Sequence, residues 1–257
     1  MYNYGEAFQI DLTKLRSKNE AMFTGQKYRI TILTERLVRF EYSENGVFND
    51  FATQLVTFRN FDVPKFEVRE DKNYIEIDTS YMKISYTKEE PFKGTSISPT
   101  KNLKVEAKNT NFVWYFGNVE AKNYYGSNIS AEEKKKDNVQ NRGLFNLDGV
   151  ASIDDSDSLR LDGSGTIIEP PKGVVDTYLF VYNKDFGLCI QDYFKLTGYP
   201  ALIPRYALGN WWSRFHKYSE ESYLELVDNF EKEEIPLSVA VIDMDWHIVK
   251  NVPKVDS

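Results

Sequence analysis

The chain has 257 residues, of which 41% are hydrophobic and 28% charged, a balance typical of a soluble globular protein. Its length suits one large domain, or one domain with part of a second. The net charge of −7 at pH 7 argues against a nucleic-acid partner, because such proteins present a basic surface.

No run of 18 apolar residues is present, so we expect no membrane span and no membrane partner. The first residues, M-Y-N-Y-G-E-A-F, lack the basic and apolar regions of a signal peptide, and we expect a cytoplasmic protein. The single cysteine, Cys189, lies in the apolar run G-L-C-I-Q and is expected to be a buried small hydrophobic residue without a disulfide.

Residues from about 20 to 195 follow a β pattern with alternating apolar and polar positions. The expected strands are 27–33, 36–42, 73–78, 81–86, 111–115 and 176–182. Thr34 and Glu35 separate the first two strands and predict a hairpin. Short strands at this spacing predict an antiparallel sandwich, and the 15% aromatic residues suit its core. Stacking faces for sugar rings are the functional alternative for these aromatics.

A different composition, rich in Asn, Ser, Asp and Gly, runs from about 119 to 172. We expect the Lys134–Lys136 run within it to be a solvated loop tip. A loop region this long is uncommon in a compact domain and is often functional.

The pattern changes after residue 196. Pro200 and Pro204 suggest a linker, and residues 206–212 resemble a short strand. Residues 219–234 predict a helix with Ser219 as N-cap and with one apolar stripe, formed by Tyr223, Leu226, Val227 and Phe230. The run L-S-V-A-V-I at 237–242 predicts a strand buried on both faces, as in a parallel sheet.

Residues from about 197 to the end of the chain therefore predict one βαβ unit. Two strands and one helix cannot bury their own apolar faces, so we expect further strands beside them. We read the chain as the N-terminal piece of a longer protein and expect the remainder of a barrel as its partner. Because the unfinished flank is apolar, we expect the last sixty or so residues to be poorly ordered or packed against a second copy of the chain, as a homo-oligomer.

Carboxylates and aromatic rings follow both strands of this unit. Asp243 ends the second strand, and near the end of the first we place Asn210, Trp211, Trp212, Arg214 and Phe215. Ligand groups sit at the carboxyl ends of barrel strands, so both sets should face one mouth, where they suit a sugar. Alternatively, Asp243 caps a following helix or pairs with Arg214. We expect no metal, because the acids and two histidines lack a ligand spacing such as H-E-x-x-H, and no cofactor.

The run P-R-Y-A-L-G-N-W-W-S-R-F from Pro204 to Phe215, with I-P-L-S-V-A-V-I-D-M-D-W-H from Ile235 to His247, resembles the start of the catalytic barrel of glycoside hydrolase family 31. That family contains α-glucosidases, α-xylosidases and related transglycosidases. The resemblance implies a galactose-mutarotase-like antiparallel β-sandwich over 1–196, followed over 197–257 by the first βαβ unit of an incomplete (β/α)8 barrel.

The same resemblance implies roles for individual residues. Asp243 corresponds to the acid that binds hydroxyls of the terminal sugar, Met244 to the apolar residue beside it, and Phe215 to an aromatic residue lining the pocket. The segment N-L-D-G-V-A-S-I-D-D-S-D-S-L from 146 to 159 looks like the sandwich loop that reaches the active site, near 145–160. Asp154 or Asp155 then corresponds to its sugar-contacting carboxylate, and we prefer Asp155.

The family's catalytic residues have no counterpart in this chain. Its nucleophile lies in a W-x-D-M-N-E-like motif on a later strand and its acid/base lies later still, so we assign no catalytic residue. The resemblance implies a retaining α-glycosidase of α-glucosidase type, with an oligosaccharide or small α-glycoside as substrate, and an isolated piece without activity. The alternatives are a stand-alone carbohydrate-binding β-sandwich and a purely structural interaction domain.

Overall fold

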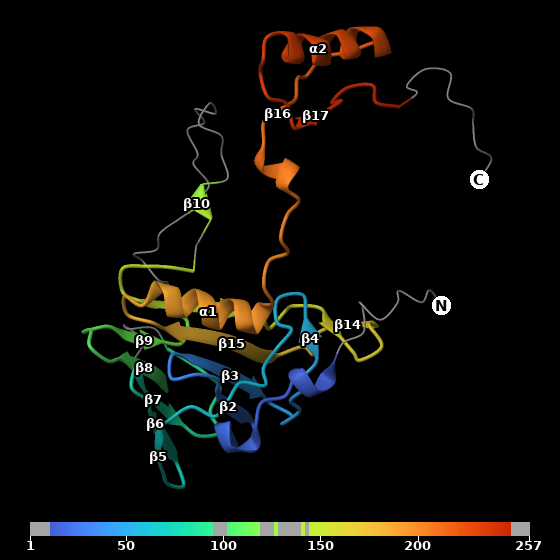
Figure 1. Cartoon of the computed structure of the whole chain (residues 1–257). Helices are drawn as coiled ribbons and strands as arrows, with labels where there is room; N and C mark the ends of the chain where they lie inside the picture. The colour runs from blue at the N-terminus through green and yellow to red at the C-terminus, as the bar shows by residue number, and fades with distance from the viewer. Residues whose placement is uncertain (1–10, 95–101, 119–125, 128–139, 142–143, 248–257) are drawn as a thin grey trace, which may run out of the picture. The chain divides into compact units, whose positions relative to one another are not determined.

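The computed structural model describes residues 11–94, 102–118, 126–127, 140–141 and 144–247. The chain divides into two compact units, Met1–Tyr199 and Pro200–Ser257 (Figure 1). The first unit is mainly β, with antiparallel sheets.

One five-stranded sheet of the first unit joins strands from both ends of its sequence. Its order is β1 (Met22–Thr24), β2 (Tyr28–Ile32), β3 (Leu37–Ser43), β15 (Val174–Val181) and β12 (Val150–Asp154). All neighbours pair antiparallel. The predicted hairpin at Thr34–Glu35 is confirmed, because Ile32 of β2 pairs with Val38 of β3 across it.

The second five-stranded sheet is a meander in chain order. It contains β5 (Glu67–Glu70), β6 (Tyr74–Asp78), β7 (Met82–Thr87), β8 (Leu103–Ala107) and β9 (Val113–Tyr115). Buried and half-buried residues alternate along β7 and β8, which is the pattern of a strand with one face on a core.

The main core lies between these two sheets. Alternate side chains of β2, β3 and β15 meet alternate side chains of β6 to β9 in one buried cluster. Phe40 stacks on Trp114, with 6.1 Å between their ring centroids, and Tyr28 meets Tyr86 edge to face at 5.0 Å. The aromatic residues therefore fill a sandwich core, where each fully buried side chain is worth about 1.5–3 kcal/mol.

A second, smaller core covers the opposite face of the first sheet. Here Cys189 and Leu196 of α1 (Phe186–Thr197) pack in one buried cluster with Phe180 of β15 and with Tyr182, which directly follows that strand. Helix α1 corrects the expectation that residues up to about 195 are all β. Its buried residues, Cys189, Asp192 and Leu196, recur at helical spacing, and Gly198 ends it with a positive φ of 96°.

Short elements complete the first unit. They are η2 (Leu12–Lys14), η3 (Asn19–Ala21), the sheet β14 (Ile167–Ile168), β13 (Arg160–Leu161) and β4 (Ala52–Thr53), and the pair β10 (Gly126–Ser127) and β11 (Gln140–Asn141). The predicted solvated tip at Lys134–Lys136 lies outside the described residues.

The second unit is a strand–helix–strand arrangement. It contains η4 (Arg205–Leu208), β16 (Trp211–Trp212), α2 (Glu220–Lys232) and β17 (Val239–Ala240). The parallel pairing of β16 with β17 confirms the βαβ prediction. Two details differ from expectation. The 3-10 helix η4 replaces the start of the predicted strand, and the 237–242 run is half-buried or exposed instead of buried on both faces.

The predicted helix of the second unit is confirmed. Ser219 caps α2, and its side chain accepts a hydrogen bond from the Ser222 N–H while the Ser222 side chain accepts one from the Ser219 N–H. The predicted apolar stripe is the half-buried face of the helix. Among the residues that the structure describes, no helix is both long enough and apolar enough to cross a bilayer.

Candidate sugar-binding site

The parallel pair β16–β17 carries the candidate residues of the second unit. Trp211 pairs with Val239 and Trp212 with Ala240, and the Val241 N–H donates to the Trp212 carbonyl at 2.9 Å. Since the strands are parallel, the segments that follow them leave the sheet at the same edge. Phe215 and Asp243 both lie in those segments, as predicted.

The side chains of Asp243, Phe215 and Met244 are all at least partly exposed to solvent. Asp243 is exposed, the Phe215 side chain is 82% exposed, and Met244 is half-buried. In the described part of the chain no ion pair joins Asp243 to Arg214, and no helix begins between Asp243 and residue 247. Neither structural alternative for Asp243 is therefore seen, and its carboxylate is free to accept hydrogen bonds from a ligand.

The neighbouring Asp245 has a different situation. Its carboxylate forms an ion pair with Lys217, with 2.9 Å between Oδ2 and Nζ, and its backbone has a positive φ of 54°. The strand alternation that would place Asp243 and Asp245 on one face has ended before this point. His247 contacts the Trp246 ring, with centroids 4.4 Å apart.

Asn210 is a correction to the expected mouth. It precedes β16 instead of ending it, and its side-chain amide donates to the Pro236 carbonyl at 2.9 Å. Trp211 donates its indole N–H to the Ala207 carbonyl at 3.1 Å, and Trp212 packs edge to face on Phe230 of α2. These polar and aromatic groups hold the unit together.

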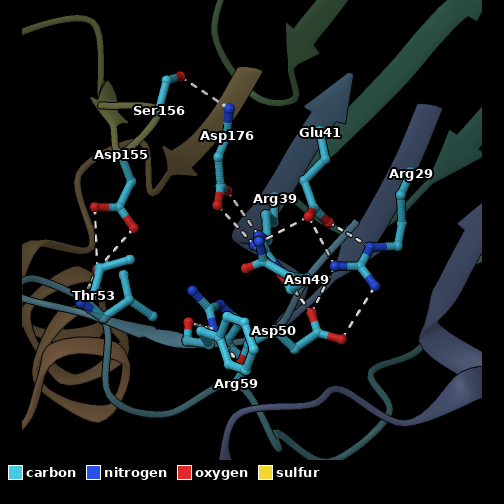
Figure 2. A network of polar contacts seen from close by, with 12 residues as sticks. Arg29, Arg39, Glu41, Asn49, Asp50, Thr53, Arg59, Asp155, Ser156 and Asp176 are labelled. Atoms are coloured by element: carbon cyan, nitrogen blue, oxygen red, sulfur yellow. Dashed lines mark hydrogen bonds and ion pairs between the residues drawn. The ribbon is translucent and has the colours of Figure 1, made fainter. Parts of the chain in front are cut away.

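In the first unit, the 146–159 loop has buried and exposed members. Asn146 is 1% exposed, its N–H donates to the Tyr182 hydroxyl at 2.8 Å, and its side chain bonds both backbone groups of Val150. Asp155 is fully buried and accepts from the Thr53 hydroxyl at 3.2 and 2.9 Å (Figure 2). Asp154, at the end of β12, is exposed. The structure therefore gives Asp154 the accessible carboxylate, although the sequence favoured Asp155.

A buried network of charged groups lies beside this loop and was not anticipated (Figure 2). Arg39 of β3 binds Asp176 of β15 through two hydrogen bonds, at 2.8 and 2.7 Å. Arg29 of β2 binds Glu41 at 2.6 and 2.8 Å, and Arg29 and Arg39 share Asp50. The signal available in the sequence is the set of polar positions in the alternating strands, and alternation alone does not show that these positions are buried.

The network shifts the pKa values of its members in opposite directions. Burial alone raises the pKa of Asp176, but the Arg39 guanidinium more than offsets this and holds it at about 2. Burial raises the pKa of Asp155, against hydrogen bonds from Ser158 and Thr53. Burial also raises the pKa of Glu41, which Arg39 and Arg29 only partly counter.

The remaining candidate from the sequence, Cys189, has a structural role. Cys189 is free and 1% exposed, which confirms the predicted buried residue, and burial raises the pKa of its thiol to about 12. The described residues contain no cluster of three or more His, Cys, Asp or Glu side chains arranged to hold a metal ion.

Comparison with known proteins bears on both units. Residues 200–256 match the sequence model of the glycosyl hydrolases family 31 TIM-barrel domain. A 66-residue stretch is 35% identical to the α-xylosidase of Saccharolobus solfataricus, over 26% of this chain and 9% of that protein. Residues 200–256 are therefore similar to the barrel domain of glycoside hydrolase family 31. The βαβ unit, with Phe215, Asp243 and Met244, lies within the matched range.

Solved family 31 enzymes share the fold. A Flavobacterium johnsoniae GH31 dextranase complexed with glucose aligns with a TM-score of 0.54 and 15% identity, over 86% of this chain and 31% of that one. A GH31 α-xylosidase from a soil metagenome, complexed with xylose, aligns with a TM-score of 0.54 and 12% identity, over 88% and 40%. The chain thus spans well under half the length of these relatives.

Proposed function

We propose that residues 1–257 form the sandwich and the first barrel unit of a retaining α-glycosidase that acts on terminal α-linked sugars of oligosaccharides or small α-glycosides. The observation that carries the proposal is the family 31 barrel match over residues 200–256, which contains Phe215 and Asp243 beyond one edge of a parallel strand pair. The names of the relatives, α-xylosidase and dextranase, support an α-linked sugar and leave xylose or glucose open.

Asp243 is the proposed ligand of the sugar hydroxyls. Its carboxylate is exposed and forms no ion pair with a described residue, so it can accept two hydrogen bonds from neighbouring hydroxyls, each worth about 1.5–3 kcal/mol when one partner is charged. Phe215 and Met244 supply apolar contact for the ring. This division of labour is common in ligand sites, where apolar side chains provide most of the contact and a few polar groups fix the orientation.

The bond-breaking groups are proposed to come from the remainder of the catalytic barrel. A retaining glycosidase needs two carboxyl groups about 5–5.5 Å apart, one as nucleophile and one as acid/base. We assign neither role to a residue of this chain, so its proposed contribution is recognition of the substrate.

A sugar titration tests this proposal. We expect methyl α-D-glucopyranoside or methyl α-D-xylopyranoside to shift the NMR signals of the backbone amides at 214–216 and 241–245. The corresponding methyl β-glycosides are the matched control and should shift them much less. Equal shifts with both anomers, or shifts confined to residues far from these segments, would argue against an α-glycoside site at β16–β17.

A further inference from the structure

Asp155 differs from the other buried acids of the first unit in what it contacts. Asp176 and Glu41 each bind a guanidinium group, whereas no described basic residue forms an ion pair with Asp155. Its carboxyl accepts from the Thr53 hydroxyl at 3.2 and 2.9 Å, and in Figure 2 the dashed lines from Asp155 lead only to Thr53. Asp155 is therefore a fully buried acid without a paired cation.

The charges around Asp155 disfavour its ionised form. Asp176 of β15 accepts a hydrogen bond at 2.8 Å from the Asp155 N–H, and its own carboxyl stays ionised with a pKa of about 2. In the same turn, Asp154 and Asp157 are exposed. Burial and the charge of Asp176 raise the pKa of Asp155, which its hydrogen bonds and the charge of Arg59 only partly counter.

The neutral acid suits the hydrogen bonds that surround it. The Thr53 hydroxyl oxygen accepts from the N–H groups of Leu55 and Val56, at 3.2 and 2.8 Å, so its own proton is directed at Asp155. The Ser158 hydroxyl also bonds the Asp155 side chain, and a hydroxyl can accept the proton of a neutral acid as well as donate one. These contacts hold the 154–158 turn against β4.

Arg59 offers a different partner to the ionised acid. It is fully buried, and it donates from Nε to the Tyr178 hydroxyl at 2.6 Å and from Nη1 to the Phe51 carbonyl at 3.0 Å. Its Nη2 is buried, and no described residue accepts a hydrogen bond from it. A carboxylate is the acceptor that a buried guanidinium N–H favours most, because the hydrogen bond is then charge-assisted.

We propose that Asp155 is a pH-sensitive switch for the 154–158 turn. As the neutral acid it stays with Thr53 and holds the turn against β4. When the pH rises, it releases its proton to solvent, the carboxylate moves from Thr53 toward Arg59 Nη2, and the turn loosens. The two arrangements differ by one proton and one partner, so a change in protonation selects between them. The inference is independent of the proposed sugar site.

A pH titration of the 257-residue chain by NMR tests the switch. We expect the side-chain carboxyl carbon of Asp155 to titrate at a higher pH than its ordinary pKa of 3.8. The amide signals of 154–158 and the Nε–H signal of Arg59 should shift with the same midpoint. Protection of the 154–158 amides against hydrogen exchange should fall about tenfold above that midpoint, as for the loss of one buried hydrogen bond.

Two variants assign the transition to Asp155. Asp155→Asn keeps a neutral side chain at every pH and should abolish the transition, whereas Asp157→Asn, at an exposed acid of the same turn, should leave it unchanged. Because the folded pKa of Asp155 lies above the unfolded one, its contribution to stability is complete at low pH and is lost as the pH rises through the folded pKa. Wild type should therefore lose stability relative to Asp155→Asn over that interval, measured by urea denaturation.

Three results would overturn the switch. They are an Asp155 carboxyl that titrates at or below 3.8, a raised midpoint that the 154–158 amides do not follow, and a transition that persists in Asp155→Asn. If Asp155→Asn does not fold, the wild-type titration decides through the first two. None of these results bears on the proposed function, because no sugar is present in the experiment.

Discussion

Asp176 shows how a single buried carboxylate is stabilised in the sandwich. Removing both charges of the Asp176–Arg39 pair from water is unfavourable, and burial alone raises the pKa of the carboxyl. Two hydrogen bonds from Arg39, with Arg59 and Arg160 nearby, outweigh this and lower the pKa from 3.8 to about 2. The ionised form is therefore the one that the fold stabilises.

The pH dependence of stability follows from this direction. Because the folded pKa lies below the unfolded one, the contribution of Asp176 is complete above about pH 5 and is lost as the pH falls from about 4 to 2; its size is roughly 2 kcal/mol. We expect the gap in free energy of unfolding between wild type and Asp176→Asn to shrink over that interval. Urea denaturation at each pH measures it, and a gap that is constant down to pH 2 would contradict the assignment.

At this scale the sequence predicted some residues and missed others for a physical reason. Asp243 follows an apolar run directly, so its exposed place after the strand could be anticipated. Asp154 and Asp155 lie at the end of β12, where alternation stops, and the buried one is identified only by its contact with Thr53 about a hundred residues earlier. Long-range partners of this kind leave no local pattern.

Among the elements, α2 was predictable because its signals are local. An N-cap serine, acidic residues in the first turn and a 3.6-residue apolar period all occur within one window. Helix α1 was missed because its short apolar run is compatible with either a strand or a helix, and packing on β15 decides between them. The run at 237–242 was expected to be buried on both faces, which requires neighbouring strands and helices that the second unit by itself does not supply.

The cap of α2 gives a prediction at the same scale. Ser219→Ala removes the acceptor for the Ser222 N–H and half of a reciprocal pair of hydrogen bonds, so we expect it to destabilise the helix by about 1 kcal/mol. Hydrogen exchange at the α2 amides should accelerate accordingly. Ser213→Ala, at an exposed serine outside the helix, is the control; equal exchange in both variants would show that the cap contributes nothing.

For the whole molecule, the distribution of aromatic rings weighs against a stand-alone carbohydrate-binding sandwich. The aromatic rings of β2, β3, β7 and β9 lie mostly in the main core, where Phe40, Trp114, Tyr28 and Tyr86 are at most 3% exposed. The second unit, in contrast, exposes Trp211, Phe215 and Trp246 by more than half. This contrast supports placing sugar recognition in the second unit.

The proposed role of Asp243 is tested most directly by kinetics in an enzyme that joins residues 1–257 to the remainder of a family 31 barrel. Asp243→Asn should lower kcat/KM for an aryl α-glycoside by about 10²–10⁴-fold, as expected for losing charged hydrogen bonds to the sugar. Asp245→Asn is the matched control and should change it by less than about threefold, because Lys217 already engages that carboxylate at the surface. Unchanged kinetics in Asp243→Asn, or equal losses in both variants, would contradict the account.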